Sequence, residues 1–361
     1  MEKRKIIALL IACLLLLTAV TSIAVAKKPI QKRTIYVNDD FYHPKKTSDG
    51  SRAFPYTTIQ QGIDAANPGD TVFVYNGIYN ENVIINKRIN LVGQNKLNTI
   101  IDGKGLIVVE ITGPSGYVNI SGFTLENGSY GIIGTWYNMI TGNNVYLNNI
   151  GIELADYGND NIISNNDISN NGMGITFGKY SYDNIISGNK ILNNNDVGIF
   201  LGHSYTEYNI ISGNNISNNA DIGVFVLGSC TNNISDNIIS NNNKGIELWG
   251  SYNNKVTGNH IYSNNYGICF TSTLVPIVNN KICNNYFNNI NNACFLYYEP
   301  SYNNIWNISK TPGKNIVGGS YLGGNYWSDY TGTDADGDGL GDTPYTIPGG
   351  SNQDMYPLMI P

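Results

Sequence analysis

The stretches NIISNN (161–166), NIISGN (184–189) and NIISGN (209–214) are near copies of one another. Weaker copies precede and follow them, and the last Asn recurs every 22 to 26 residues, at Asn143, Asn166, Asn189, Asn214, Asn237, Asn259 and Asn285. Apolar residues hold fixed places around each of these Asn; around Asn166 they are Ile163, Ile168 and Ile175. A repeat of this length indicates a solenoid whose units bury their apolar faces against their neighbours.

The spacing inside a repeat predicts strands. Apolar residues two apart, such as Ile175 and Phe177, mark strands with one face turned inward. Asn accounts for 57 of the 361 residues, and it disfavours helices and favours tight turns. We therefore predict an all-β fold, a single-stranded parallel β-helix of about ten coils between about residues 71 and 310. A leucine-rich-repeat solenoid would need a leucine framework, and a β-propeller blade needs roughly twice this period.

Equivalent residues of successive coils should stack about 4.8 Å apart, so that each repeat position becomes a column. We expect the Ile and Val columns to fill the interior. The repeat Asn lies between two inward apolar positions, so we expect an internal ladder in which each amide bonds to its neighbours above and below. The alternative is a row of solvated turn residues.

A short helix should cover the N-terminal end of the coils. In residues 56–67, Ile59, Ile63 and Ala66 fall on one apolar face. The sequence Pro68-Gly69-Asp70 ends this segment, and a strand-like run follows it. Because a β-helix leaves open sheet edges at its ends, we interpret the segment as a capping helix.

The N-terminus is typical of an export signal. Lys3-Arg4-Lys5 precedes an apolar run, and Ala24-Val25-Ala26 provides an A-x-A cleavage site. We predict a signal peptide at 1–26, with an uncleaved anchor helix as the alternative; in both cases the remainder lies outside the membrane. The other predicted parts are a lead-in segment (27–55), the β-helix with its capping helix (56–310) and an Asp-rich tail (311–361).

Two stretches resemble a known family. Residues 58–93, TIQQGIDAANPGDTVFVYNGIYNENVIINKRINLVG, resemble the opening of pectin-lyase-like right-handed β-helix proteins. Residues 323–347, GGNYWSDYTGTDADGDGLGDTPYTI, resemble the C-terminal segment of NosD-like proteins. The resemblance covers nearly all of the chain after the signal and implies a right-handed helix. It also implies kinship with exported accessory proteins of copper-enzyme assembly, with surface proteins of no assigned activity, and more distantly with polysaccharide lyases, hydrolases, epimerases and glycan-binding adhesins.

The tail contains a candidate calcium loop. Carboxylates alternate with glycines there, at Asp334, Asp336, Asp338 and Asp342. This spacing matches the first part of an EF-hand loop, in which oxygen ligands converge on Ca²⁺. The twelfth position is Tyr345 in place of Glu, and no helices flank the loop, so we predict a variant structural Ca²⁺ site with Asp329 or Asp354 as a possible further ligand. The alternative is a solvated acidic turn.

Aromatic residues near the repeats form a candidate carbohydrate-binding flank: Tyr137, Tyr182, Tyr208, Tyr252 and Trp249. If the repeat stacks them, sugar rings could pack on their faces while Asn amides bond to sugar hydroxyls. The alternative is an aromatic stack that only stabilises the loops.

The residues that similar enzymes use are missing, which argues against catalysis. No Arg follows Arg88, and the one Asp-Asp pair, Asp39-Asp40, precedes the cap. Isolated carboxylates could still form an unfamiliar pair; they are Glu153, Asp156, Asp160, Asp183 and Glu247. The three histidines, His43, His203 and His260, are too widely spaced to indicate a copper site. Four cysteines follow the signal, at 230, 269, 283 and 294, and the spacing leaves their pairing open.

These observations favour an exported, non-catalytic protein at the cell surface or secreted, which presents a polar and aromatic face to a polysaccharide or wall glycan. The net charge of −6 and 21 Lys and Arg residues exclude a basic nucleic-acid-binding face. Contact with a membrane is expected only if the N-terminal segment stays uncleaved. The alternatives are a NosD-like accessory protein of copper-enzyme maturation and a polysaccharide-active enzyme (lyase, hydrolase or epimerase) with a non-standard site.

Overall fold

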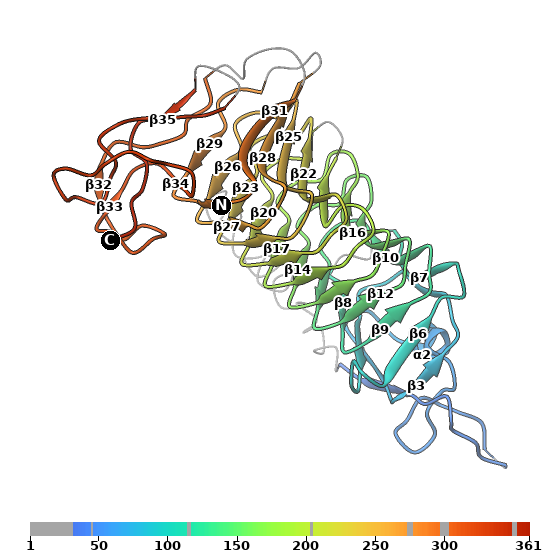
Figure 1. Ribbon diagram of the computed structural model, residues 1–361. Helices are drawn as coiled ribbons and strands as arrows, with labels where there is room; N and C mark the ends of the chain where they lie inside the picture. The colour runs from blue at the N-terminus through green and yellow to red at the C-terminus, as the bar shows by residue number, and fades with distance from the viewer. Residues whose placement is uncertain are drawn as a thin grey trace, which may run out of the picture. The chain divides into compact units, whose positions relative to one another are not determined.

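The computed structural model describes residues 32–44, 46–113, 117–202, 205–272, 277–296, 303–348 and 352–361. The predicted signal peptide and His203 lie outside these ranges. The unit Thr34–Pro361 is a parallel β-solenoid of about nine turns, close to the ten expected, with three parallel sheets. The predicted all-β parallel β-helix is therefore confirmed, and Figure 1 shows its strands stacked coil upon coil. In the described residues no helix is both long and apolar enough to cross a bilayer.

Each coil gives one strand to each sheet, in the order A, B, C. Sheet A contains β1 (Thr34–Val37), β2 (Thr71–Val74), β5 (Asn90–Gly93), β8 (Asn119–Ser121), β11 (Met139–Thr141), β14 (Ile162–Ser164), β17 (Ile185–Ser187), β20 (Ile210–Ser212), β23 (Asn233–Ser235), β26 (Lys255–Thr257) and β29 (Lys281–Cys283). Sheet B contains β3 (Gly77–Tyr79), β6 (Thr99–Asp102), β9 (Thr124–Glu126), β12 (Asn144–Tyr146), β15 (Asp167–Ser169), β18 (Lys190–Leu192), β21 (Asn215–Ser217), β24 (Ile238–Ser240), β27 (His260–Tyr262), β30 (Tyr286–Asn288) and β34 (Tyr326–Trp327). Sheet C contains β4 (Val83–Ile85), β7 (Ile107–Ile111), β10 (Tyr130–Gly134), β13 (Ile150–Leu154), β16 (Met173–Phe177), β19 (Ile199–Leu201), β22 (Ile222–Leu227), β25 (Lys244–Trp249), β28 (Tyr266–Thr271) and β31 (Asn291–Leu296). The tail adds two antiparallel pairs, β32 (Thr311–Pro312) with β33 (Tyr321–Leu322) and β35 (Tyr345–Thr346) with β36 (Gln353–Asp354).

The interior consists of apolar columns in strict register. In sheet A, Ile140 pairs with Ile163, Ile163 with Ile186 and Ile186 with Ile211. All four side chains are at most 1% exposed. The predicted filling of the interior by stacked Ile and Val is confirmed, and each such burial contributes roughly 1.5–3 kcal/mol.

Asn residues, all buried except the half-buried Asn289, form three ladders, one at each corner between sheets. The ladder between sheets A and B contains the predicted Asn143, Asn166, Asn189, Asn214, Asn237, Asn259 and Asn285 and continues to Asn325. The ladder between sheets B and C runs through Asn148, Asn171, Asn194, Asn219, Asn242, Asn264 and Asn289. The ladder between sheets C and A runs through Asn138, Asn161, Asn184, Asn209, Asn232, Asn254, Asn280 and Asn304. The sequence analysis identified one of the three.

A single rung shows why Asn is needed. The Oδ1 atom of Asn189 accepts the backbone N–H (3.0 Å) and the Nδ2 (3.1 Å) of Asn166. Its own Nδ2 donates to the carbonyl of Ile163 (2.8 Å) and to Oδ1 of Asn214 (3.0 Å). Every donor and acceptor of the side chain is therefore satisfied inside the protein, as a buried amide requires.

Helix α2 (Ile59–Ala65) covers the N-terminal end and is shorter than the predicted 56–67. The Thr58 side chain caps it by accepting the N–H of Gln61. The Gln60 side chain accepts the N–H of Ile84 (2.9 Å) and donates to its carbonyl (3.2 Å). β4 is the edge strand of sheet C at the N-terminal end of the solenoid. The Gln60 amide thus makes the hydrogen bonds that a further strand would make beside it.

A carboxylate ends the A/B ladder at the other end of the solenoid. The Oδ2 atom of Asp354 accepts the backbone N–H of Asn325 (2.7 Å) and Nε1 of Trp327 (2.9 Å), and its Oδ1 accepts the N–H of Tyr356 (3.1 Å). The side chain of Asp354 is fully buried, and this burial raises its pKa to about 6 in spite of the hydrogen bonds. Asp354 therefore stands where a further ladder Asn would stand.

Candidate functional site

The loops from sheet C back to sheet A carry most of the exposed aromatic residues of the coils. Counted backward from the C/A ladder Asn, these loops make three columns. Four residues before the Asn lie Tyr157, Tyr180 and Tyr205, which we call the tyrosine stack. Two residues before it lie Tyr182, Glu207, Cys230 and Tyr252, which are joined by successive parallel bridges. One residue before it lie Tyr137, Asp160, Asp183 and Tyr208, and Tyr117 takes the same place one coil earlier, before Val118.

The tyrosine stack is regular and exposed. Its ring centroids are 5.1 Å apart between Tyr157 and Tyr180 and 5.3 Å apart between Tyr180 and Tyr205, with rings within 9° of parallel. The three side chains are 54%, 39% and 59% exposed. Tyr180 has a ring on either side, so the stack offers mainly ring edges and hydroxyl groups to solvent. It can therefore bind a ligand chiefly by hydrogen bonds along its length and by ring contact at its two ends.

The backbone of the tyrosine stack is in a conformation that Tyr disfavours. The φ angles of Tyr157, Tyr180 and Tyr205 are 63°, 59° and 68°, in the left-handed region. The equivalent positions of the next two coils hold Gly228 and Gly250, with φ angles of 60° and 54°. Glycine adopts this conformation without steric penalty, whereas another residue there is strained by roughly 1 kcal/mol or more.

The five predicted carbohydrate-binding residues do not form one column. Tyr137 stacks on Tyr117 at 5.2 Å, and Tyr208 occupies the same column further along. Tyr182 and Tyr252 belong to the second column, separated by Glu207 and Cys230. Trp249 ends β25 and packs on Phe225 of β22 with centroids 6.2 Å apart. The sequence analysis did not select Tyr157, Tyr180 and Tyr205 as candidates, although their constant offset from the ladder Asn was a usable signal.

Cys230 is held as a thiol. Its Sγ donates to Oε1 of Glu207 at 3.0 Å. Burial, followed by this hydrogen bond, raises the pKa of Cys230, which disfavours the reactive thiolate. The hydrogen bond between Cys230 and Glu207 therefore helps to hold the second column together.

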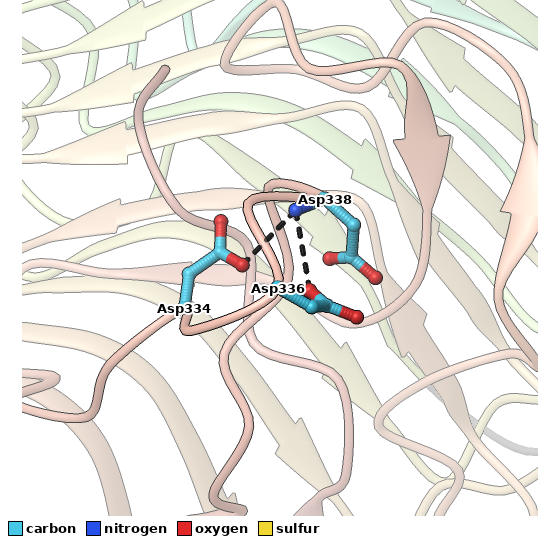
Figure 2. Close-up of side chains that lie close together, drawn as sticks. All are labelled: Asp334, Asp336 and Asp338. Atoms are coloured by element: carbon cyan, nitrogen blue, oxygen red, sulfur yellow. Dashed lines mark hydrogen bonds between the residues drawn. The ribbon is translucent and has the colours of Figure 1, made fainter.

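The Asp-rich loop brings three of its four predicted carboxylates together. Asp334, Asp336 and Asp338 each offer an oxygen within 4.8 Å of the others. Figure 2 shows the three side chains close together in the loop. Asp334 accepts the N–H groups of Gly337, Asp338 and Gly339, and these hydrogen bonds, foremost that from Gly339, lower its pKa. The side chain of Lys310 pairs with Asp338.

The other residues considered for this loop are engaged elsewhere. Asp342 accepts the N–H of Ala335 at 2.6 Å. Asp329 accepts the hydroxyl of Tyr345 at 2.9 Å, and Asp354 ends the A/B ladder. Both carboxylates thus hold the tail together, and the group of converging carboxylates consists of Asp334, Asp336 and Asp338.

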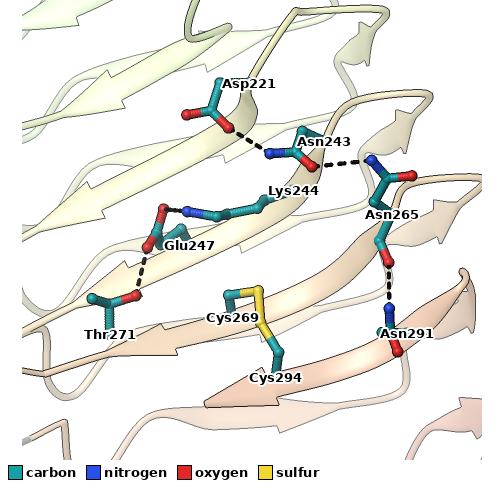
Figure 3. Close-up of a disulfide and its surroundings, with 9 residues drawn as sticks. All are labelled: Asp221, Asn243, Lys244, Glu247, Asn265, Cys269, Thr271, Asn291 and Cys294. Carbon is teal, nitrogen blue, oxygen red and sulfur yellow. Dashed lines mark hydrogen bonds and ion pairs between the residues drawn. A yellow bond between two sulfur atoms is a disulfide. The ribbon is translucent and has the colours of Figure 1, made fainter. Parts of the chain in front are cut away.

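The outer face of sheet C holds a disulfide and a buried ion pair (Figure 3). Cys269 of β28 is bonded to Cys294 of β31, which answers the pairing that the sequence left open. In the neighbouring β25, Glu247 is 2% exposed, pairs with Lys244 at 2.7 Å and accepts the hydroxyl of Thr271 at 2.5 Å. Glu247 is thus a satisfied structural carboxylate rather than half of an exposed catalytic pair.

Comparisons with known proteins agree with this architecture. The family model described as "Periplasmic copper-binding protein (NosD)" matches residues 63–233 and 174–332. Among curated proteins no relative matches the chain. An alginate lyase from Paenibacillus sp. str. FPU-7 superposes with a TM-score of 0.60 and 19% identity, over 73% of this chain and 98% of the lyase. The A-module of the mannuronan C-5 epimerase AlgE4 of Azotobacter vinelandii superposes with a TM-score of 0.55 and 18% identity, over 73% of this chain and 98% of the module. XylC, solved with xylose, superposes with a TM-score of 0.60 and 13% identity, over 73% of this chain and 70% of XylC. At these identities the structural likeness concerns the fold alone.

Proposed function

The chain belongs to the NosD family, and from this premise we propose that it is an extracytoplasmic β-helix protein that binds polysaccharide on the flank formed by the C-to-A loops. The solenoid is the scaffold, and the tyrosine stack is the centre of the binding surface. The proposed role is non-catalytic recognition of a cell-surface or wall glycan, as the sequence analysis expected.

The observation that carries this proposal is the strain in the stack. Folding alone favours glycine at these positions, as Gly228 and Gly250 show. Three successive coils nevertheless hold an exposed Tyr there, at a cost of roughly 1 kcal/mol each. Strained, exposed aromatic residues on a rigid scaffold are characteristic of binding surfaces, and tyrosine hydroxyls and Asn amides suit sugar hydroxyls. The chain's neighbours in fold include an alginate lyase and a mannuronan C-5 epimerase, which is consistent with a glycan ligand.

Affinity electrophoresis of the full chain without its first 26 residues tests the proposal. Gels containing different soluble polysaccharides should retard the wild type in at least one case. The triple variant Tyr157→Gly, Tyr180→Gly, Tyr205→Gly should lose this retardation, because glycine keeps the backbone conformation and removes the rings. Tyr262→Ala serves as the matched control, because this Tyr is 37% exposed on sheet B, away from the C-to-A loops. Equal retardation of the triple variant and the wild type would refute the role of the stack.

The disulfide supports an extracytoplasmic location. Disulfides persist in oxidising compartments and are rare in the cytosol. Alkylation of the unfolded, unreduced chain without residues 1–26 should label Cys230 and Cys283, and leave Cys269 and Cys294 unlabelled until reduction. Labelling of all four before reduction would contradict this location.

A role in copper-enzyme maturation is the second candidate, because the family is described as copper-binding. Copper favours Cys, Met and His ligands. In the described part of the chain, His43 and His260 contact the rings of Phe54 and Tyr286, and the one group of three or more converging ligands is the carboxylate trio at Asp336. These donors do not fit copper. Equilibrium dialysis against Cu²⁺ and Cu⁺ tests this second function. It would be favoured if the chain retained copper in a stoichiometric amount and if the Asp336→Ala variant retained the same amount.

A further inference from the structure

We infer that the tyrosine stack binds an extended, uncharged polysaccharide that lies parallel to the solenoid axis, with one sugar residue per coil. This inference rests on the glycan-binding function proposed above and specifies its ligand. Two observations carry it: the spacing of the stack and the sign of the charges around it.

The spacing favours a chain that runs lengthwise. Successive rings of the stack are 5.1 and 5.3 Å apart, and they follow one another along the axis. This step is close to the length of one pyranose unit in an extended 1,4-linked chain. A chain in this direction meets an equivalent hydroxyl at every sugar, whereas a chain lying across the axis meets a single Tyr.

The charges around the stack exclude an anionic chain. Four carboxylates stand in the same loops, those of Asp156, Asp160, Asp183 and Glu207, against the single Lys179. Asp160 and Asp183 are exposed and lie in the column next to the corner Asn. The negative charge of Asp160 is also the largest cause of the raised pKa of Tyr137.

A polyuronate such as alginate would add one carboxylate per sugar to this surface. Like charges brought together at an interface repel one another unless they are paired, and Lys179 alone cannot pair with such a row. An uncharged chain meets no such opposition and can accept hydrogen bonds from the Tyr hydroxyls. The ligand class thus differs from that of the alginate-acting proteins that share the fold.

Affinity electrophoresis in about 0.15 M salt, where charges within about 8 Å still interact, tests the charge selection. Hydroxyethylcellulose and glucomannan serve as uncharged probes and alginate as the anionic probe. We expect the uncharged gels to retard the wild type and alginate to leave it unretarded. The double variant Asp160→Asn, Asp183→Asn keeps a residue that tolerates a positive φ, and we expect it to gain retardation in alginate.

Equal retardation of the wild type by alginate and by an uncharged polymer would overturn the inference while leaving glycan binding intact. Retardation by no polysaccharide would refute the proposed function, and the inference with it.

The direction of the chain is tested by removing one hydroxyl at a time. Tyr157→Phe, Tyr180→Phe and Tyr205→Phe keep the stacked rings. For a lengthwise chain each should weaken binding by a similar factor, about 2- to 10-fold, the worth of one hydrogen bond. An effect confined to one of the three would show that the chain crosses the axis and would overturn the lengthwise placement.

Discussion

At the corner between sheets A and B every coil from Asn143 to Asn285 presents the same side chain in the same bonds. In the loops from sheet C to sheet A, equivalent positions hold Tyr157, Tyr180 and Tyr205 and then Gly228. The corner is buried, where an unpaired amide is penalised, so substitution there is restricted. The loop faces water, and its residues are free to serve a ligand. The two regions show that one repeat unit can keep the same residue at a buried corner and vary the residue in an exposed loop.

The largest expected effect is at a ladder rung. Asn189→Ala leaves the backbone N–H of Asn166 and the carbonyl of Ile163 buried without their partners. We expect the free energy of unfolding to fall by about 3–5 kcal/mol, because each orphaned buried group costs about 1–3 kcal/mol. Urea denaturation followed by circular dichroism measures it. Asn195→Ala, at an exposed Asn of the next corner, is the control and should change stability by less than about 0.5 kcal/mol.

The second effect concerns the end of the same ladder. The pKa of Asp354 is raised to about 6 in the folded chain, above the ordinary value of 3.8. The folded state therefore binds a proton more tightly than the unfolded state. The stabilisation from Asp354 is complete below about pH 4 and is lost as the pH rises through 6.

The measurement is the free energy of unfolding of the wild type and of Asp354→Asn between pH 4 and pH 8. The free energy of unfolding of the wild type should rise relative to that of the variant as the pH falls, since Asn does not titrate. A difference that stays constant over this range would show that the Asp354 carboxyl keeps an ordinary pKa.

A smaller effect is expected in the tail. The Asp loop there is exposed, like the flank, but its carboxylates are held by hydrogen bonds, like the ladder Asn side chains. If it holds Ca²⁺, EDTA should lower the melting temperature by a few degrees, because a ligand of the folded state stabilises it by mass action. Asp336→Ala should melt at the same temperature with and without EDTA. An unchanged melting temperature of the wild type after chelation would mean that the loop is an acidic turn held by its own N–H groups.

The smallest effect is expected in the flank itself. Tyr180→Gly relieves a strained φ and loses two ring contacts, each worth about 0.5–1.5 kcal/mol. We expect these contributions to cancel to within about 1 kcal/mol of unfolding free energy. A loss comparable to that of Asn189→Ala would erase the distinction between the two regions and assign the stack a structural role.

Much of the fold could be predicted because its cause is periodic. Ile163 and its equivalents recur at fixed offsets, and apolar residues at such a spacing indicate positions that are buried in the interior of stacked coils. Two ladders were missed because exposed and buried Asn look alike in sequence: in the pair Asn170-Asn171 the first is exposed, with a φ of 55°, and the second is buried. The recurrence of Asn161, Asn166 and Asn171 five residues apart was the available signal.

The candidate site was harder to predict because the three columns of the flank differ by single residues. Tyr182 and Tyr208 both precede a ladder Asn closely, but by two residues and by one, so they belong to different columns. Whether Tyr rings stack also depends on the backbone conformation, and only the structure shows that positions such as Tyr180 are left-handed.

Each ladder Asn donates to the amide of the following coil and to a carbonyl of the preceding coil, and it accepts from the amide of the preceding coil, so that a rung is its own complement. A coil duplicated between Asn166 and Asn189 would meet the same ladder groups on both sides, and it would leave no ladder amide without a partner. The number of coils is therefore not fixed by the fold. Genetic duplication or deletion of a 23-residue unit can lengthen or shorten the rod, and the two caps would fit any length.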